Sequence, residues 1–476
     1  MSAFASTTNH HTYAGRHLVV VGAGISGIGA ARFLAARGAK VTLADRRPAE
    51  KLPPEVIQLQ SEGIAIEAGA HRPETLRAAD EIVLSPGVPP TLAALQPARE
   101  AGVPIIGEIE LAFRHLRGRI VAITGSNGKS TTTTLTGRLL ADGGLPTQVG
   151  GNIGVAAVSL VETSRDDGWT VLECSSFQLE TVVTFRPHIG ILLNITPDHL
   201  DRHGTFENYV AAKLNMFRRF DGETLAVLNA DDPTTPRAQA QLAAQGAPVT
   251  LFSAQRELEE GLFLRGNDLV CRTRQAERVL LHRADLPLPG RHNLENILAS
   301  LAAALAAGVA PETARTTIRD FRGLEHRLEF VAEVGGVRYL NDSKATNVAA
   351  AQVSIEAFPS GLHVILGGLD KNSDFAPLAD ALASRAVSVA LIGTAAEKIA
   401  ATFAGRLHQP ITRHASLEDA VHSLARRARP GDVVLLAPAC ASFDMFDNFE
   451  HRGRVFKATV KGLISDVQRE ASCSPD

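Results

Sequence analysis

Gly125-Ser126-Asn127-Gly128-Lys129-Ser130-Thr131 is the stretch of this 476-residue chain that decides its fold. An apolar, β-branched segment, residues 119–123, precedes it, and a Thr-rich and then Leu-rich segment, residues 132–140, follows it. A strand, a Gly-rich turn, a Lys-Ser pair and a helix in this order bind nucleoside triphosphates, because the N–H groups of the turn and of the helix N-terminus surround phosphate oxygens. Lys129 can reach the β- and γ-phosphates, and the Ser130 hydroxyl can ligate Mg²⁺. Ile123 stands where the longer form of the motif has glycine, so we predict a phosphate-binding loop of the short Gly-x-x-Gly-Lys-Ser form.

The composition is that of an ordinary globular protein. Its length suggests about three domains, and 45% hydrophobic and 21% charged residues are typical values. A net charge of −3 gives no indication of a nucleic-acid or anionic membrane surface. The four scattered cysteines support neither a disulfide framework nor a zinc site and favour a reducing compartment. We therefore expect a cytoplasmic protein without nucleic-acid or membrane partners, whose residues 1–15 form a flexible extension.

A glycine motif marks the first domain. Gly22-x-Gly24-x-x-Gly27 follows a predicted strand at residues 17–21, and Asp45 ends the next strand about twenty residues on. Taken alone, this pattern predicts a dinucleotide site with Asp45 on a ribose. The rigid loop Ser85–Pro89 follows a further strand at residues 81–84, at the sheet edge where open α/β sheets bind ligands. The first domain is thus predicted to be α/β and to end near residue 115.

In the second domain, polar side chains follow two apolar strands. The strand at 169–172 ends at Glu173, and the strand at 188–193 is followed by a segment that contains His199. In a doubly wound sheet both side chains lie beside the phosphate loop, where a carboxylate and an imidazole suit a divalent metal. The alternatives are a strand-end capping acid and a polar turn histidine. An amphipathic helix is predicted at 205–220, and its Lys213 would ordinarily be solvated.

A second part of this domain and a third domain complete the chain. Residues 257–282 alternate apolar and polar positions, which predicts a small antiparallel piece. From about residue 323, a hairpin around Gly335-Gly336 precedes strands at 363–366, 387–392 and 433–436 with helices between them, which predicts a further parallel sheet. The predicted fold is α/β with three domains: a Rossmann-like N-terminal domain, a central P-loop ATPase-like domain with a mainly parallel sheet, and a Rossmann-like C-terminal domain.

Two stretches of the third domain allow more than one interpretation. Asp342–Asn347 follows a strand and is either a helix cap or, with Arg327 upstream, a contact to a nucleotide. Ser442–Gly453 mixes aromatic and acidic residues, and on the structural interpretation it is a helix N-terminus whose phenylalanines pack on the core.

Together these motifs resemble the Mur ligase family from about residue 15 to residue 465. Glu173–Gln178, and Ser442–Asp444 with Asn448–Glu450, resemble the members of that family that add D-glutamate. The matching segments are Thr124–Thr131, Gly151–Gly154, Glu173–Glu180, Asp198–His203, Tyr209–Lys213, Pro289–Asn293, His326-Arg327, Asn341–Asn347, Ala439–Asp444 and Asn448–Glu450.

The resemblance implies an ATP-dependent amide ligase of peptidoglycan precursor synthesis. ATP would phosphorylate the carboxylate of UDP-MurNAc-L-Ala, and the amine of D-glutamate would attack the acyl phosphate, giving amide, ADP and phosphate. Residues 1–115 would bind the UDP substrate, residues 116–322 ATP, and residues 323–476 D-glutamate. A monomer is expected. Nucleotide contacts on both Lys129 and Arg327 would require the third domain to close onto the second.

The resemblance also implies residue roles. The implied catalytic residues are Lys129, Glu173, His199 and Lys213. Two Mg²⁺ ions are implied, one held by Ser130 and Glu173, the other by His199 and by Lys213 as a carbamate. The implied ATP contacts are Gly125, Ser126, Asn127, Gly128, Lys129, Ser130, Thr131, Thr132, Asn152, Asn296, Arg327 and Asp342. The implied D-glutamate contacts are Lys344, Thr346, Lys371, Ser442 and Phe449. The implied UDP-substrate contacts are Ile25, Ser26, Arg47, Ser85, Pro86 and Gly87, whereas Arg46 departs from the threonine that the family often has there.

Two other classes of function compete with the ligase. One is an NAD(P)-dependent oxidoreductase that uses Gly22–Gly27, and the other is a regulatory P-loop protein whose outer domains bind partners. A dehydrogenase would leave Glu173, His199 and Lys344 without a role, and a regulator would not need carboxylate-binding groups at Lys344 and Ser442. We therefore expect ATP and Mg²⁺, and no NAD.

Overall fold

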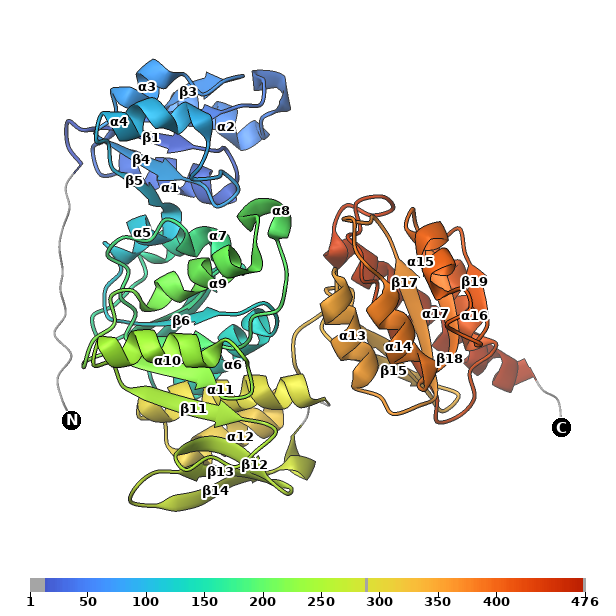
Figure 1. Ribbon diagram of the computed structural model, residues 1–476. Helices are drawn as coiled ribbons and strands as arrows, with labels where there is room; N and C mark the ends of the chain where they lie inside the picture. Colours follow the sequence, from blue (N-terminus) through green and yellow to red (C-terminus); the bar gives the residue numbers. More distant parts are fainter. Residues whose placement is uncertain (1–12, 287–289, 474–476) are drawn as a thin grey trace. The chain divides into compact units, whose positions relative to one another are not determined.

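The computed structural model describes residues 13–286 and 290–473 (Figure 1). These residues form two compact units, one made of residues 13–286 and 295–321 and the other of residues 290–294 and 322–473. Most of the extension expected at residues 1–15, and Pro289 of the family motif, lie outside the described residues. Among the described residues, no helix is both long enough and apolar enough to cross a membrane.

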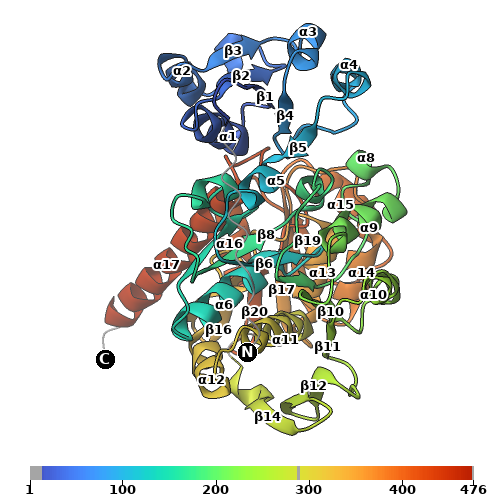
Figure 2. The same cartoon turned by 90° about the vertical axis from the view of Figure 1, so that its left-hand side faces the viewer.

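The first sheet has five parallel strands in the order β3-β2-β1-β4-β5. Its strands are β1 His17–Val21, β2 Lys40–Asp45, β3 Ala65–Ala68, β4 Glu81–Leu84 and β5 Ile105–Gly107. Its helices are α1 Ile25–Ala35, α2 Pro54–Ser61, α3 Pro73–Arg77, α4 Gln96–Glu100 and, after β5, α5 Glu108–Phe113. Leu18 and Val20 of β1 pack in the core under α1 and α2, and Val19 and Val21 pack in the core under α3 and α4 (Figure 2). Both faces are covered, which is why β1 is apolar from Leu18 to Val21.

The second sheet has nine strands in the order β14-β13-β12-β11-β10-β9-β6-β8-β7. The strands are β6 Arg119–Thr124, β7 Thr147–Gly151, β8 Trp169–Glu173, β9 Ile189–Leu192, β10 Leu225–Asn229, β11 Val249–Ser253, β12 Gly261–Arg265, β13 Asp268–Arg272 and β14 Glu277–His282. The helices are α6 Lys129–Asp142, α7 Ser176–Leu179, α8 Leu200–His203, α9 Phe206–Leu214, α10 Thr235–Ala244, α11 Arg291–Ala306 and α12 Pro311–Asp320. Strands β12 to β14 pair antiparallel, which confirms the prediction for residues 257–282, and they extend one edge of the otherwise parallel sheet.

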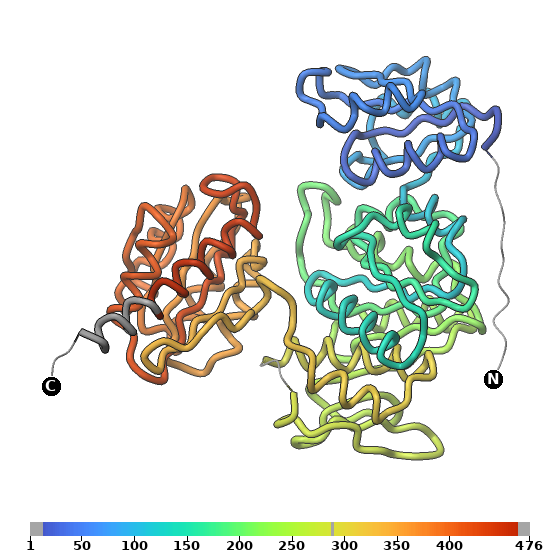
Figure 3. Tube along the Cα trace, turned by 180° about the vertical axis from the view of Figure 1, so that it is seen from behind, coloured from blue at the N-terminus to red at the C-terminus, as the bar shows by residue number. Residues whose placement is uncertain are grey.

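The third sheet has six strands in the order β15-β16-β20-β17-β18-β19. The strands are β15 Glu329–Val334, β16 Val337–Asn341, β17 Leu362–Gly367, β18 Ala386–Ile392, β19 Ile411–Arg413 and β20 Val433–Leu436. The helices are α13 Val348–Glu356, α14 Ala376–Ala383, α15 Ala396–Phe403, α16 Leu417–Ala425 and α17 Phe449–Cys473. The predicted hairpin is β15–β16, and the other pairs are parallel. Helices α13 to α15 cover one face, and α16 and the long α17 cover the other (Figure 3).

The predicted α/β fold class is therefore confirmed, but some elements differ from the prediction. The helix predicted at 205–220 ends as α9 at Leu214 and continues as a 3₁₀ turn, Asn215–Phe217. This tighter turn buries Met216 and Phe217 completely, and the Asn215 amide donates to the carbonyl of Leu179. The glycine-rich segment Gly150–Gly154 predicts a loop, but Gly150 and Gly151 belong to the edge strand β7. Strands β3, β11 and β19 were not predicted; β3 and β19 are short strands at sheet edges.

Candidate active site

Strand order brings the predicted nucleotide-binding segments of the central sheet together. Strands β9, β6, β8 and β7 are consecutive parallel neighbours, so their carboxyl ends meet at one edge. The loop Gly125–Gly128 follows β6, Glu173 ends β8, Asn152 follows β7, and the segment with His199 follows β9. Residues up to 74 positions apart in the sequence, from Gly125 to His199, thus border one loop.

The conformation of the phosphate loop requires its glycines. Gly128 has φ +85°, and a Cβ atom there would lie 2.2 Å from Oδ1 of Asn296 on α11. That oxygen also accepts a hydrogen bond from Thr132 Oγ1 at 3.2 Å. Helix α6 begins at Lys129, directly after the loop, so its first N–H groups face the space that the loop surrounds. Lys129 Nζ donates to the carbonyls of Gly125 at 2.8 Å and Ser126 at 2.9 Å.

Asn194 and Tyr209 hold the loop, and the sequence predicted a role for neither, although Tyr209 begins one of the segments that match the family. The backbone N–H of Asn127 donates to Asn194 Oδ1 at 2.9 Å, and Asn194 Nδ2 donates to the Asn127 carbonyl at 3.1 Å. The Tyr209 hydroxyl lies 3.0 Å from Ser126 Oγ. Asn194 stands directly after an apolar strand, as Glu173 does at the end of its own, and this position is the signal by which it could have been found.

Glu173 offers an oxygen with the properties of a metal ligand. Its side chain is buried, and Oε1 accepts from Asn152 Nδ2 at 2.8 Å. Oε2 is also buried, yet it accepts no hydrogen bond from any described residue. A buried carboxylate oxygen without a donor is costly unless a cation binds it. The residues at this sheet edge therefore fit a divalent cation.

Lys213 is buried, contrary to the ordinary expectation of a solvated helix lysine. Its side chain is 1% exposed, and Nζ donates to the carbonyl of Gly125 at 2.7 Å. This is the same carbonyl that Lys129 contacts. Burial, and then the neighbouring charge of Lys129, lower the pKa of Lys213 well below its ordinary value. Lys213 is therefore suited to the neutral amine form.

His199 lies at the mouth of the same region. It caps α8 in a left-handed conformation with φ +53°, and its ring meets the Phe177 ring edge-on at 4.9 Å between centroids. Burial lowers the pKa of His199, with the Asp198 carboxylate acting in the opposite direction. A neutral imidazole is the form that binds a metal.

In the second unit, three neighbouring strands carry the predicted D-glutamate residues. Strands β16, β20 and β17 are adjacent and parallel, and the segments after them hold Lys344 and Thr346, Ser442 and Phe449, and Lys371. Lys344 Nζ lies 3.7 Å from the centroid of the Phe449 ring. The bridge between Leu369 and Ala441 brings the segments of Lys371 and Ser442 together. This edge presents two lysines and a buried hydroxyl, which are groups that bind carboxylates.

Arg452 holds these segments, and sequence reasoning missed it. Its guanidinium is fully buried and donates to the carbonyls of Cys440 and Ser343 and to the Ser343 hydroxyl. Arginines on a helix are usually solvated, so no local signal singles it out. Nearby, burial raises the pKa of Asp342 to about 6, although Arg327 acts to lower it.

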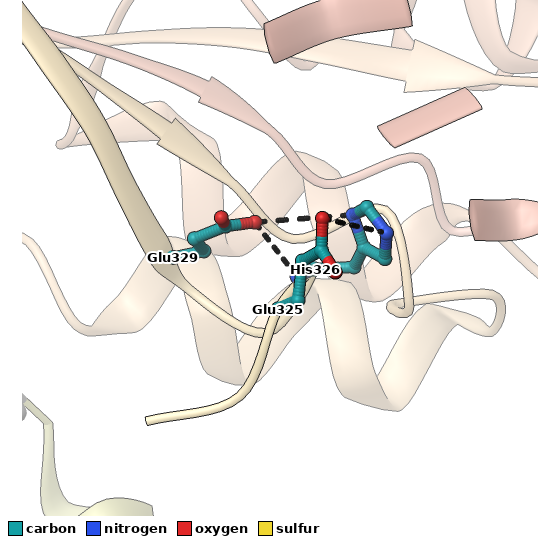
Figure 4. A group of neighbouring side chains, drawn as sticks. All are labelled: Glu325, His326 and Glu329. Atoms are coloured by element: carbon teal, nitrogen blue, oxygen red, sulfur yellow. Dashed lines mark hydrogen bonds and ion pairs between the residues drawn. The ribbon is translucent and has the colours of Figure 1, made fainter. Parts of the chain in front are cut away.

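One group of potential metal ligands lies elsewhere in this unit. Glu325, His326 and Glu329 converge at the turn before β15 (Figure 4). Lys457 Nζ lies 2.8 Å from Glu325 Oε1 and also pairs with Glu329. Because an ammonium group already compensates both carboxylates, we interpret this cluster as the support of the turn that carries Arg327.

In the first sheet, the segments after β1, β2 and β4 adjoin. Ser85 Oγ donates to the Gly22 carbonyl at 2.7 Å, and a Cβ atom on Gly27 would lie 1.9 Å from that carbonyl oxygen. Burial acts to raise the pKa of Asp45, but hydrogen bonds from Arg47 and from the Ala23 N–H outweigh it and lower this pKa to about 2. The predicted residues Ile25 and Ser26 begin α1, and Pro86 and Gly87 follow Ser85.

Comparisons with known proteins identify the family to which the chain belongs. Models of the Mur ligase MurD-like N-terminal domain, the Mur ligase middle domain and the Mur ligase glutamate ligase domain match residues 16–107, 123–304 and 326–440. The UDP-N-acetylmuramoylalanine–D-glutamate ligase of Acidobacterium capsulatum is 52% identical over 94% of this chain and 96% of its own length. The chain belongs to the Mur ligase family.

Other relatives agree with this membership. The UDP-N-acetylmuramoylalanine–D-glutamate ligase of Koribacter versatilis is 49% identical over 96% of this chain and 99% of its own. Among solved structures, MurF ligase from Thermotoga maritima in complex with ADP matches with a TM-score of 0.60 and 17% identity, over 89% of this chain and 95% of its own. At that identity the likeness concerns the fold alone, and it agrees with the three α/β sheets of this Mur ligase.

Proposed function

We propose that this Mur ligase is the ATP-dependent enzyme that joins D-glutamate to UDP-N-acetylmuramoyl-L-alanine, releasing ADP and phosphate, in peptidoglycan precursor synthesis. The observation that carries the proposal is the gathering of Lys129, Glu173 and Lys213 around one phosphate loop, in a chain 52% identical to a D-glutamate ligase. The reaction would pass through an acyl phosphate that the amine of D-glutamate attacks. We assign UDP-substrate binding to residues 1–115, ATP binding to 116–322 and D-glutamate binding to 323–476.

In the ATP site, Lys129 would exchange its two loop carbonyls for oxygens of the β- and γ-phosphates. The N–H groups of residues 125–132 would hold the phosphates, with Asn152 and Asn296 at the border of the loop. In the second unit, Arg327 and Asp342 would contact the nucleotide. Dependence on ATP follows from this arrangement, because the acyl phosphate needs an activated phosphoryl group.

Mg²⁺ would be held by Ser130 with Glu173, and a second ion by His199 with Lys213. Bound there, the ions would neutralise phosphate oxygens and polarise the γ-phosphate. The buried, unpaired Oε2 of Glu173 supports the first assignment. The burial of Lys213 supports its reaction with CO₂, because only a neutral amine forms a carbamate.

The carboxylates of D-glutamate would bind among Lys344, Thr346, Lys371, Ser442 and Phe449. The UDP moiety would lie at Ile25, Ser26, Arg47 and Ser85–Gly87. Because Asp45 is already bonded to Arg47 and to the Ala23 N–H, it is poorly suited to hold the ribose of NAD, which argues against an oxidoreductase. We further propose that the enzyme acts as a monomer in the cytoplasm, where this substrate class is made.

A phosphate-release assay tests the proposal. With ATP and Mg²⁺, the protein should release phosphate only when both UDP-MurNAc-L-Ala and D-glutamate are present, and L-glutamate should not replace D-glutamate. Lys129→Ala should abolish this release, and Arg165→Ala, which changes an exposed ion pair with Asp167, serves as the matched control. Turnover of NADH, or phosphate release independent of D-glutamate, would refute the ligase assignment.

A further inference from the structure

Arg202 links a loop of the first sheet to the central domain. It belongs to α8 and its side chain is only 12% exposed. Its Nη2 donates to the Val88 carbonyl at 3.1 Å, and Nη1 donates to the Gly87 carbonyl at 3.5 Å. These carbonyls belong to the loop after β4, which starts at Ser85. One guanidinium thus holds two consecutive backbone groups of a loop 114 residues away in the sequence.

The same guanidinium is fixed on its other side within the central domain. Nη2 also donates to Glu180 Oε2 at 2.7 Å, and the carbon of the guanidinium lies 4.7 Å from the Phe177 ring centroid. Glu180 Oε1 in turn lies 3.2 Å from His203 Nδ1. The Phe177 ring meets the His199 ring edge-on. The contacts therefore run from the Gly87-Val88 loop through Arg202 and Phe177 to His199.

We propose that Arg202 is a positioning residue that holds the UDP-substrate loop, Ser85–Val88, and the His199 segment in one arrangement. This inference rests on the proposed function, since it assumes that Ser85–Gly87 contacts the UDP substrate. Arginine suits the role, because its planar guanidinium carries several donors in a fixed geometry and stacks on an aromatic ring. Lysine could pair with Glu180, but its single nitrogen lacks the planar fork from which Arg202 donates through two separate nitrogens. Arg202 itself touches backbone and side chains, not the reacting atoms.

The proposal predicts a selective kinetic effect. In Arg202→Ala, the loop loses its charged donors, so we expect the KM and the calorimetric Kd for UDP-MurNAc-L-Ala to rise about tenfold or more, the range of a hydrogen bond to a charged group. The KM for D-glutamate should stay within twofold of the wild-type value. In Arg202→Lys, which keeps a contact to Glu180, the KM for UDP-MurNAc-L-Ala should lie between the values of the wild type and of Arg202→Ala. A decrease in kcat should accompany the KM effect, because the Phe177 contact to His199 loosens.

Arg186→Ala is the matched control, since Arg186 pairs with Asp221 and Glu223 within the central domain. It should leave every KM unchanged. A purely structural role of Arg202 would lower Tm without a change in the KM for UDP-MurNAc-L-Ala, and that result, or an equal rise of all KM values, would overturn the proposal. If Arg202→Ala does not fold, Arg202→Lys decides by the same criterion. Wild-type protein without D-glutamate-dependent phosphate release would instead refute the proposed function, so the two failures are distinguishable.

Discussion

The substitution Lys213→Ala provides the sharpest test of the proposed carbamate. The Nζ atoms of Lys129 and Lys213 lie 2.8 and 2.7 Å from one carbonyl oxygen, so they are at most about 5.5 Å apart. Two ammonium groups at that separation repel by about 3 kcal/mol at an effective dielectric constant of 20. A carbamate on Lys213 turns this repulsion into an attraction of similar size. The geometry thus disfavours an ammonium group on Lys213, in agreement with its lowered pKa.

The expected result follows from this charge change. If Lys213 is carbamylated as proposed, Lys213→Ala removes the anionic oxygens, and the loss of one preorganised electrostatic group typically lowers kcat by about 10²–10³-fold. Added formate or acetate should restore part of kcat by supplying carboxylate oxygens in the space left by the side chain. Lys40→Ala, at an exposed position on the first sheet, should leave kcat unchanged.

Two measurements check the reasoning, namely phosphate release with and without formate, and ¹³C NMR of protein incubated with ¹³C-bicarbonate. We expect a carbamate resonance in the wild type that is missing from Lys213→Ala. If the wild-type protein lacks that resonance and no carboxylate restores the activity of Lys213→Ala, the assignment of a carbamate to Lys213 is wrong. Lys213 would then act as an amine on the loop or the phosphates.

Three further predictions concern separate parts of the molecule. Gly128→Ala should abolish ATP-dependent phosphate release, because the new Cβ would lie 2.2 Å from Asn296 Oδ1; normal activity would contradict the loop geometry. Burial raises the pKa of Glu108 from 4.5 to about 7, so the folded state binds the proton of this carboxyl group more tightly than the unfolded state does. The free energy of unfolding should therefore fall by about 3 kcal/mol as the pH rises from 4 to above 7. Glu108→Gln should lose this dependence and be the more stable protein at pH 8 in urea unfolding. Lys344→Ala, which removes the ammonium group over Phe449, should raise the KM for D-glutamate about tenfold or more. An unchanged KM would show that Lys344 does not bind D-glutamate.

Much of the candidate site could be predicted because its residues come directly after strands in the sequence. An apolar run of four to six residues identifies a buried strand, and the polar residue after it must lie at the carboxyl edge of a parallel sheet. Glu173, Asn152 and Lys344 were found by their place in the sequence in this way, or by the family motif. The strand order that makes these edges coincide comes from pairings across the whole domain, and no local pattern encodes it.

The environment of a side chain was the part that local patterns could not predict. Lys213 has the sequence context of a solvated helix lysine, and only the approach of α9 to a loop 88 residues earlier buries its amine against the Gly125 carbonyl. Arg202 and Arg452 are similar, since each is defined by carbonyls from distant segments. In all three cases a basic side chain donates to backbone oxygens of a distant segment. A backbone carbonyl is present at every position, so no residue type marks such a contact in the sequence. We conclude that Lys213, Arg202 and Arg452 owe their roles to backbone partners that motifs cannot identify, and substitutions at Lys213 and Arg202 test these roles directly.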